Sequence, residues 1–257
     1  MSRSRRRITT IRMRVFRGIK SLPPLRNAVA TMGSFDGVHS GHRVLLERVK
    51  QRAKELDGES VVFTFDPHPR YALGTAEGMQ LLSTLEEKIW LLEQAEIDNL
   101  IIIPFTLEFS RTSPMDFIQS LTGLGIRSMV VGYNHRFGHK KEGDYNYLSS
   151  HGAGMEIAMV EQQQVANGKV SSTIVRGAIE AGEMQRVAQM LSRPYIIIGN
   201  CNGEGLITGL EQEKMLPPAG TYRAKVEGEE CQITIGKDRC LRLGGAARDG
   251  KVLVELI

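Results

Sequence analysis

The sequence predicts an α/β fold built on a mainly parallel sheet, with a small antiparallel β module at the carboxyl end. Short apolar runs alternate with helical patterns up to residue 193, which is typical of a parallel sheet covered by helices on both faces. After Pro194 the pattern changes to short strand candidates separated by Gly, Pro and charged turns. We therefore expect two domains, formed by residues 13–193 and 194–257.

The elements of the first domain are read from apolar runs and their spacing. Uninterrupted apolar runs predict buried strands at residues 27–32, 60–65, 99–103, 129–132 and 156–160. Helical spacing predicts helices at residues 44–56, 85–96 and 114–121. The second of these helices is rich in Glu and Lys on the face that we expect to meet solvent, and Ser113 is a cap candidate for the third. This order of elements places ligands beyond the carboxyl ends of the strands.

The second domain is expected to contain strands only. Its strand candidates lie at residues 195–201, 220–227, 231–235, 239–243 and 251–257. A module of about sixty residues is near the size at which a lone domain is marginally stable, so we expect it to dock on the first domain.

Composition and charge narrow the classes of protein to which the chain can belong. Hydrophobic residues make up 41% and charged residues 24%, as in ordinary globular proteins. The three cysteines form no C-x-x-C pair, which predicts neither a disulfide framework nor a zinc site and fits a reducing cytoplasm. Residues 1–12 are expected to form a basic, flexible tail that carries much of the net charge of +4. We expect no nucleic-acid or membrane partner, while a homo-oligomer is left open.

Residues 33–42 carry the densest chemistry of the chain, with the sequence Gly-Ser-Phe-Asp-Gly-Val-His-Ser-Gly-His. They lie between the first apolar strand and the first long helix, where free amides and the helix dipole attract phosphate. His39 and His42 are three residues apart, so both can donate N–H groups to one polyphosphate. Gly41 removes the side chain that would stand between the two rings. The alternative is that one histidine is only a helix cap or a surface group.

A second cluster begins at Ser171 and opens another helix that runs through residue 180. Ser171, Ser172 and Thr173 supply three hydroxyls beside free amides, and Arg176 follows one turn later. Hydroxyls, amides and a guanidinium fork together can bind a phosphate. Taken alone, such a run is more often a simple helix cap. Its pairing with the histidine motif favours phosphate binding.

Together these motifs resemble the H-x-G-H nucleotidylyltransferases, and specifically the FAD synthetase module of bacterial riboflavin kinase/FAD synthetases. The resemblance includes further segments at residues 62–69, 131–138 and 191–195, in the order of the family, and covers about residues 13–198. It implies a Rossmann-like nucleotidylyltransferase domain that transfers AMP from ATP to the phosphate of FMN, giving FAD and pyrophosphate with the assistance of Mg²⁺.

The resemblance also implies roles for individual residues. The expected catalytic residues are His39, His42 and Arg176. The expected ATP-binding residues are Gly33, Ser34, Phe35, Asp36, Gly37, Gly41, Ser171, Ser172 and Thr173. The expected FMN-binding residues are Phe65, Asp66, Pro67, His68, Asn134, Arg136 and Phe137. For the last group a rigid loop at residues 65–69 and a buried Phe137 are the structural alternatives. The sequence identifies no metal ligand, and Asn134 stands where many relatives carry Asp, which weakens a magnesium role at that position.

The chain departs from the family after Tyr195. The bifunctional enzymes continue into a longer riboflavin kinase barrel, which carries a Pro-Thr-Ala-Asn segment near its start that this sequence lacks. Residues 217–222 resemble a later strand of that barrel. We therefore expect a truncated riboflavin-kinase-like barrel and no kinase activity. Two other functions are left open: a related nucleotidylyltransferase with another phosphorylated acceptor, and a non-catalytic flavin- or nucleotide-binding regulator.

Overall fold

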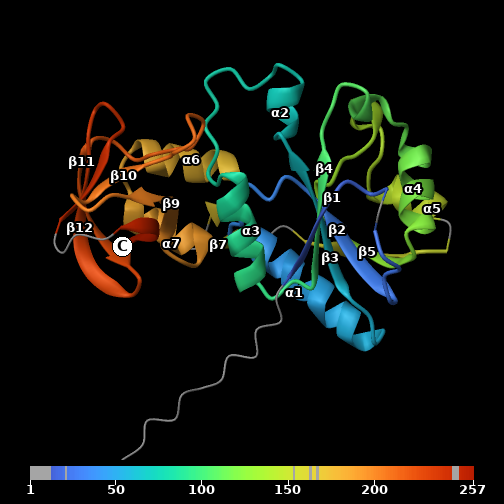
Figure 1. The fold of residues 1–257 in the computed structure, drawn as a ribbon. Helices are drawn as coiled ribbons and strands as arrows, with labels where there is room; N and C mark the ends of the chain where they lie inside the picture. Colours follow the sequence, from blue (N-terminus) through green and yellow to red (C-terminus); the bar gives the residue numbers. More distant parts are fainter. Residues whose placement is uncertain (1–12, 21, 153, 162–163, 166–167, 245–248) are drawn as a thin grey trace, which may run out of the picture.

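The computed structural model describes residues 13–257 apart from residues 21, 153, 162–163, 166–167 and 245–248. It contains a parallel sheet flanked by helices and a closed antiparallel barrel (Figure 1), which confirms the fold class expected from the sequence. The expected tail, residues 1–12, lies outside the described part of the chain. None of the helices in the described part combines the length and the apolar character needed to cross a bilayer.

The described strands of the sheet run parallel to one another. In spatial order they are β1 (Arg14–Arg17), β4 (Asn99–Pro104), β3 (Ser60–Asp66), β2 (Ala28–Met32), β5 (Ile126–Gly132) and β6 (Glu156–Val160). All were expected except β1, a short and largely exposed edge strand that pairs with β4. It was missed because its two arginines interrupt the apolar run by which a buried strand is predicted. The strand order reverses between β2 and β5, which is where ligands bind in open α/β sheets.

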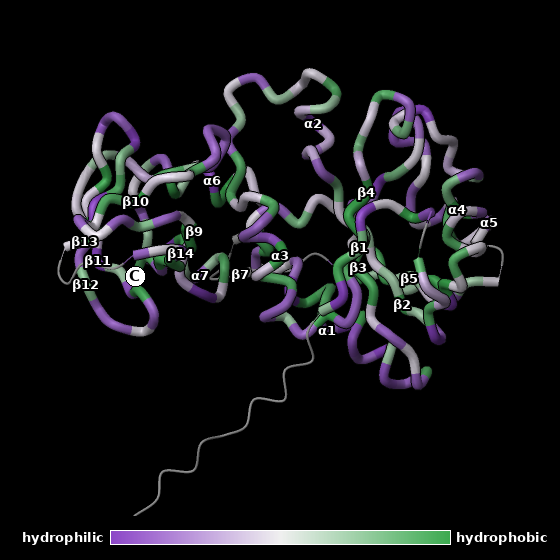
Figure 2. Tube along the Cα trace, viewed as in Figure 1, coloured by the Kyte–Doolittle hydropathy of each residue, from purple (hydrophilic) through white to green (hydrophobic). Residues whose placement is uncertain are grey.

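Helices cover both faces of the sheet. Those in the described residues are α1 (Ser40–Glu55), α2 (Pro69–Ala72), α3 (Leu85–Gln94), α4 (Pro114–Gly123), α5 (Tyr145–His151), α6 (Ser172–Glu180) and α7 (Met184–Leu191), with 3₁₀ helices at Phe109–Arg111 and His139–Lys141. On one face α4 and α5 bury Ile118 and Leu148, and on the other α1 and α3 bury Leu46 and Leu92. The central strands are correspondingly hydrophobic (Figure 2).

The barrel closes in the order β10-β13-β12-β11-β14-β9, so it leaves no open sheet edge. Its strands are β9 (Tyr195–Cys201), β10 (Leu206–Thr208), β11 (Gly220–Val226), β12 (Glu229–Ile235), β13 (Leu241–Gly244) and β14 (Gly250–Leu256). The three-residue β10 was not expected, because it is too short for a period-two pattern to register. A separate two-stranded ladder joins β7 (Gln164–Val165) and β8 (Gly168–Lys169).

Helices α6 and α7 share their hydrophobic core with the barrel. Val175 and Ile179 of α6 and Val187 and Leu191 of α7 are fully buried in the cluster that contains the barrel interior. Figure 1 shows these two helices beside the barrel strands. The expected division at residues 193 and 194 therefore falls within one continuous core, and the domain limits stay a prediction.

Helix α3 lies between the sheet and the barrel (Figure 1). The expectation of a solvent-facing Glu-Lys surface is wrong for Glu87 and Lys88, which are 0% and 5% exposed. Glu87 completes a capping box with Thr84 and also accepts a hydrogen bond from the Ile198 amide at 3.0 Å. Helical periodicity could not predict this burial, because two of the groups that donate to Glu87, on Ile198 and Lys214, lie more than a hundred residues later in the chain.

Lys214, in the segment between β10 and β11, is the principal partner of Glu87. Its fully buried Nζ donates to Glu87 Oε2 at 2.6 Å and to the carbonyl oxygens of Leu82 and Ile196, both at 2.9 Å. The ammonium also lies 4.2 Å from the ring centroid of Tyr195. All three N–H donors of this lysine are therefore used, and they connect α3, the segment before it and β9.

We expect Lys214→Met to lower the free energy of unfolding by about 3–5 kcal/mol, because Glu87 would be left as a buried, unpaired charge. Arg223→Met is the matched control, since Arg223 forms an exposed ion pair with Glu230 and its loss should cost less than about 1 kcal/mol. Urea unfolding followed by the fluorescence of Trp90, on α3, measures both changes. Equal losses for the two variants would contradict the role given to Lys214.

Candidate active site

The turn between β2 and α1 has an unusual backbone. Phe35, Gly37 and Val38 adopt φ values of 47°, 77° and 38°, a region that a β-branched residue such as Val38 rarely enters. Phe35 and Val38 are both buried, so core packing holds this conformation in place. At Gly37 a Cβ atom would lie 2.8 Å from the Leu82 side chain, which excludes larger residues. Strain of this kind is typical of a functional turn.

Side chains from distant segments fix the turn. Ser83 accepts a hydrogen bond from the Gly37 amide through its Oγ at 2.9 Å, and its own amide donates to Asp36 Oδ1 at 3.0 Å. Arg193 donates to the Gly37 carbonyl oxygen at 2.7 Å, and Thr64 Oγ1 donates to the Ser34 carbonyl oxygen at 3.2 Å. No role was predicted for these three supporting side chains, because single polar residues far apart in the chain form no pattern.

The two histidines lie together at the start of α1, as expected. Their rings stack with centroids 3.7 Å apart and an interplanar angle of 17°. His39 is the N-cap of α1, where its Nδ1 accepts a hydrogen bond from the His42 amide at 3.4 Å. A Cβ at position 41 would lie 3.3 Å from the His39 ring, so Gly41 makes room for the stack. The capping role and the paired arrangement therefore coexist in one structure.

Both histidines are neutral at neutral pH. Burial lowers the pKa of His39 to about 4. Burial, the repulsion that a second protonated ring would meet from His39, and the charge of Lys88 hold the pKa of His42 well below its ordinary value. Because His39 Nδ1 accepts a hydrogen bond, the ring proton belongs on Nε2, where it can be donated. His42 Nδ1 is buried and has no hydrogen-bond partner among the described residues. The pair thus offers neutral N–H donors.

The second motif docks on the first through Asp36. Ser172 Oγ donates to the Asp36 carbonyl oxygen at 3.0 Å, and the Arg176 guanidinium forms an ion pair with the Asp36 carboxylate. Arg176 also donates from Nε to the Gln80 carbonyl oxygen at 2.7 Å. Burial raises the pKa of Asp36, and Arg176 opposes that shift. The sequence anticipated that the two motifs meet, but not that Arg176 would be paired with a carboxylate.

The other residues of the second motif have simpler positions. Ser171 is the N-cap of α6, and its Oγ accepts a hydrogen bond from the Ile174 amide at 3.4 Å. Thr173 is exposed in the first turn of the same helix. Ser171 therefore has the capping role that was the structural alternative, while Thr173 is exposed to solvent next to Ser172, which bonds to the turn.

The expected FMN loop leaves the carboxyl end of β3, beside the end of β2. The Phe65 ring packs edge-on against Phe105 with centroids 5.3 Å apart, and the partly exposed Asp66 carboxylate lies 4.0 Å from Arg17. Pro67 is exposed and follows a cis peptide bond. His68 caps α2, and its pKa is lowered to about 4 by burial and then by the charges of Lys88, Arg176 and Arg70. This loop therefore lies within electrostatic reach of α3 and α6.

The segment after β5 lies on the other side of β2 in the sheet. Asn134 is exposed, and the exposed Arg136 forms a 3.0 Å ion pair with Asp144. Phe137 is only 5% exposed, and its ring stacks on His135 with centroids 5.7 Å apart. The structure thus places Asn134 and Arg136 at the surface and Phe137 in the core, which matches the structural alternative for Phe137.

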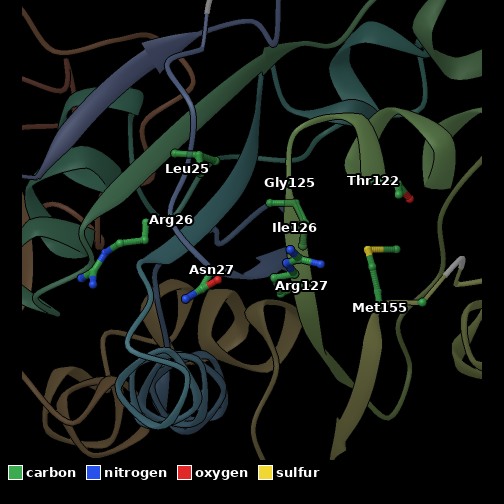
Figure 3. Close-up of a pocket in the computed structure, with 9 residues that line it drawn as sticks. Leu25, Arg26, Asn27, Thr122, Gly125, Ile126, Arg127 and Met155 are labelled. Atoms are coloured by element: carbon green, nitrogen blue, oxygen red, sulfur yellow. The ribbon is translucent and has the colours of Figure 1, made fainter.

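No group of three or more His, Cys, Asp or Glu side chains within the described residues is arranged to hold a metal ion. A cavity of about 480 Å³ lies where β2 and β5 begin, lined in part by Asn27, Ile126 and Arg127 (Figure 3). This cavity is at the opposite ends of the strands from the histidine turn and contains none of the expected site residues.

The lowered histidine pKa values predict an acid-sensitive fold. Unfolded histidines titrate near pH 6.5, whereas burial holds the pKa of His39, His68 and His135 at about 4. Between these values the unfolded chain binds more protons, so stability is present above pH 6.5 and is lost as the pH falls toward 4. We expect His135→Gln to reduce the slope of the free energy of unfolding against pH, measured by urea unfolding, by up to about 1.4 kcal/mol per pH unit. Parallel profiles for variant and wild type between pH 6.5 and 4.5 would contradict this assignment.

Comparison with known proteins identifies the family of the chain. Residues 22–174 match the family described as FAD synthetase. The chain is 33% identical over 218 residues to the bifunctional riboflavin kinase/FMN adenylyltransferase of Listeria monocytogenes, covering 79% of this chain and 69% of that protein. It is 32% identical over 213 residues to the protein of the same description from Bacillus subtilis, covering 78% of this chain and 67% of that protein.

A solved structure shares the fold over nearly the whole chain. The crystal structure titled as a macrolide-efflux protein from Streptococcus pneumoniae superposes with a TM-score of 0.82 at 20% identity, covering 95% of this chain and 90% of that one. At this level of identity the likeness concerns the fold alone. The sequence match over residues 22–174 and the relatives above show that the chain belongs to the FAD synthetase family.

Proposed function

We propose that the protein is an FMN adenylyltransferase without riboflavin kinase activity. An oxygen of the FMN phosphate would attack the α-phosphorus of ATP, and the bond from that phosphorus to the bridging oxygen of pyrophosphate would break. One observation carries the proposal: α6 contacts the histidine turn through Ser172 and Arg176, both of which bond to Asp36. Two motifs suited to phosphate binding thereby form one site.

The ATP phosphates are proposed to lie at the start of α1. Free amides of the first helical turn and the helix dipole favour an anion there. Neutral His39 and His42 add N–H donors at fixed positions, because stacking and Gly41 hold both rings. Such donors stabilise charge that develops at the phosphorus without having to reorganise during the reaction. His39 and His42 are therefore the proposed catalytic histidines.

Arg176 has two proposed tasks. Its ion pair with Asp36 and its bond to the Gln80 carbonyl hold α6 against the turn. As a partly buried guanidinium it would also add positive potential for the triphosphate, alongside the Ser171, Ser172 and Thr173 hydroxyls. The paired carboxylate reduces that potential, so Arg176 works mainly by keeping the two motifs together.

The FMN side of the site is proposed at the ends of β3 and β5, on either side of the turn. Phe65, Asp66, Pro67 and His68 would form one wall, and Asn134 and Arg136 the other. Arg136 supplies a cation for the FMN phosphate, although it must leave or share Asp144 to do so. Phe137 is buried, so it would act by holding this segment in place instead of by stacking on the flavin.

Mg²⁺ is proposed to enter with ATP. Magnesium keeps several waters and is usually held by one or two carboxylates together with substrate phosphates, which fits a site whose described residues contain no acidic cluster. Asp66, a partly exposed carboxylate at the end of β3, is the residue in position to assist. When bound, the ion neutralises charge on the phosphates.

The short segment between β9 and β11 is the basis for proposing that riboflavin kinase activity is absent. This stretch contains β10 and connecting turns, and the sequence has no Pro-Thr-Ala-Asn segment. The barrel nevertheless closes, so we propose that residues 194–257 support the adenylyltransferase of residues 13–193. A cytoplasmic location belongs to the same proposal, since none of Cys201, Cys231 and Cys240 forms a disulfide bond in the described structure.

The decisive assay incubates the full chain with Mg²⁺, ATP and either FMN or riboflavin, and measures FAD, FMN and pyrophosphate. We expect FAD and pyrophosphate from FMN, and no product from riboflavin. Formation of FMN from riboflavin would show that kinase activity remains. Turnover only with another phosphorylated acceptor would favour the related transferase, and tight nucleotide binding without turnover would favour the regulator.

A glycine pair separates chemistry from folding. Gly41→Ala places a Cβ 3.3 Å from the His39 ring and should displace it, so we expect turnover to fall by about 10²-fold while stability is kept, since Ala favours helix. Gly177→Ala, in α6, meets no atom within 4 Å and should retain wild-type turnover. Steady-state kinetics and thermal unfolding of both variants test this. Wild-type turnover in Gly41→Ala would remove the histidine stack from the proposed mechanism.

A further inference from the structure

The two buried lysines of the described chain have opposite surroundings. Lys214 donates to a carboxylate and two carbonyl oxygens. Lys88, 5% exposed on α3, has a single hydrogen bond, from Nζ to Thr64 Oγ1 at 3.3 Å, and forms no ion pair with any residue that the structure describes. A buried ammonium with unused donors and no counter-charge is costly. Such a group needs either a structural reason or a ligand.

Lys88 stands between the two substrate regions. Its partner Thr64 is near the end of β3 and also bonds to Ser34 in the histidine turn. The charge of Lys88 helps to lower the pKa of His42 on the ATP side and of His68 on the FMN side. Burial lowers the pKa of Lys88, and the more distant carboxylates of Asp36, Asp66 and Glu211 oppose that shift. Asp36, the strongest of them, is already paired with Arg176. The lysine is therefore a buried cation without an ion-pair partner among the described residues, where the phosphates of ATP and FMN would meet.

We propose that Lys88 is a substrate-contacting residue whose ammonium donates to a phosphate oxygen at the junction of the two substrates. This inference rests on the proposed adenylyltransferase function. It explains why α3 buries a lysine without a counter-charge: the phosphates supply the missing acceptors when they bind. Arg193 is a contrasting case, because this cation has no ion pair with a described residue but donates to the carbonyl oxygens of Gly37 and Pro194.

The alternative role for Lys88 is structural, through Thr64 and Ser34. Three variants separate the two roles. Lys88→Met removes the charge and leaves Thr64 bonded to Ser34. Thr64→Val removes the hydroxyl that links Lys88 to Ser34 and leaves the lysine charge in place. It therefore measures how much turnover and pyrophosphate binding depend on that hydrogen-bonded link. Lys214→Met reports what the loss of a structural lysine does to stability.

The first measurement is thermal unfolding with and without inorganic pyrophosphate, which needs no turnover. Lys88→Met should unfold at or above the wild-type temperature, because an unpaired buried charge is removed. Pyrophosphate should stabilise wild type and Thr64→Val, and this stabilisation should be lost in Lys88→Met. A marked drop in the unfolding temperature of Lys88→Met, like that of Lys214→Met, would make Lys88 structural and overturn the inference.

The second measurement is FAD formation from Mg²⁺, ATP and FMN. Lys88→Met should lower turnover by about 10²-fold or more, as for loss of one donor to a charged transition state, and Thr64→Val should lower it much less. Equal losses would show that Lys88 acts through Ser34, and wild-type turnover in Lys88→Met would also overturn the inference. If wild type makes no FAD, the proposed function fails, while the pyrophosphate measurement still decides whether Lys88 binds phosphate.

Discussion

The buried ion pair between Lys214 and Glu87 is the constraint on which the arrangement of the molecule depends. It joins the segment before β11 to the first turn of α3, and Lys214 also bonds to the strand β9 that begins the barrel. A pair of this kind adds little net stability over a well-packed apolar contact, but either partner alone is strongly destabilising. It therefore specifies one position of α3 between sheet and barrel, and alternative positions would leave a charge buried without its partner.

Helix α3 contacts the candidate active site through the residues just before its first turn. Ser83 and Thr84 precede the helix, and Ser83 exchanges hydrogen bonds with Asp36 and Gly37 of the histidine turn. From the other side α6, which shares its core with the barrel, bonds to the same Asp36. The strained turn is thus held between two elements that are both tied to the barrel. Whatever chemistry the barrel itself has, it keeps these two supports in place.

The sequence predicts the parts of this arrangement that depend on neighbours in the chain. Strands β2 to β6, a helix directly after the histidine turn and the proximity of the two histidines follow from apolar runs and spacing, although α1 begins four residues before the expected start. The burial of Glu87, the pairing of Arg176 with Asp36 and the support from Ser83 require partners brought together only by the fold. From sequence alone a charged residue is predicted to face solvent, because its partners in the fold are unknown. Glu87 and Lys88 of α3 were therefore predicted to be exposed, whereas both are buried.

The balance of charge at the turn explains how the proposed phosphate site would be held ready before substrate arrives. The two histidines are neutral, and Arg176 is compensated by Asp36, so neither motif carries a free positive charge into the folded core. Lys88 is a buried cation with no ion pair and a single side-chain hydrogen bond among the described residues, whereas Arg193 donates to two carbonyl oxygens. Because the amide and imidazole dipoles are already oriented, phosphates bound at the proposed site would meet an environment that needs little reorganisation. The turn is held by hydrogen bonds with the side chains of Ser83, Arg193 and Thr64. Arg193 donates to a backbone carbonyl oxygen of the turn, so its guanidinium supports the backbone.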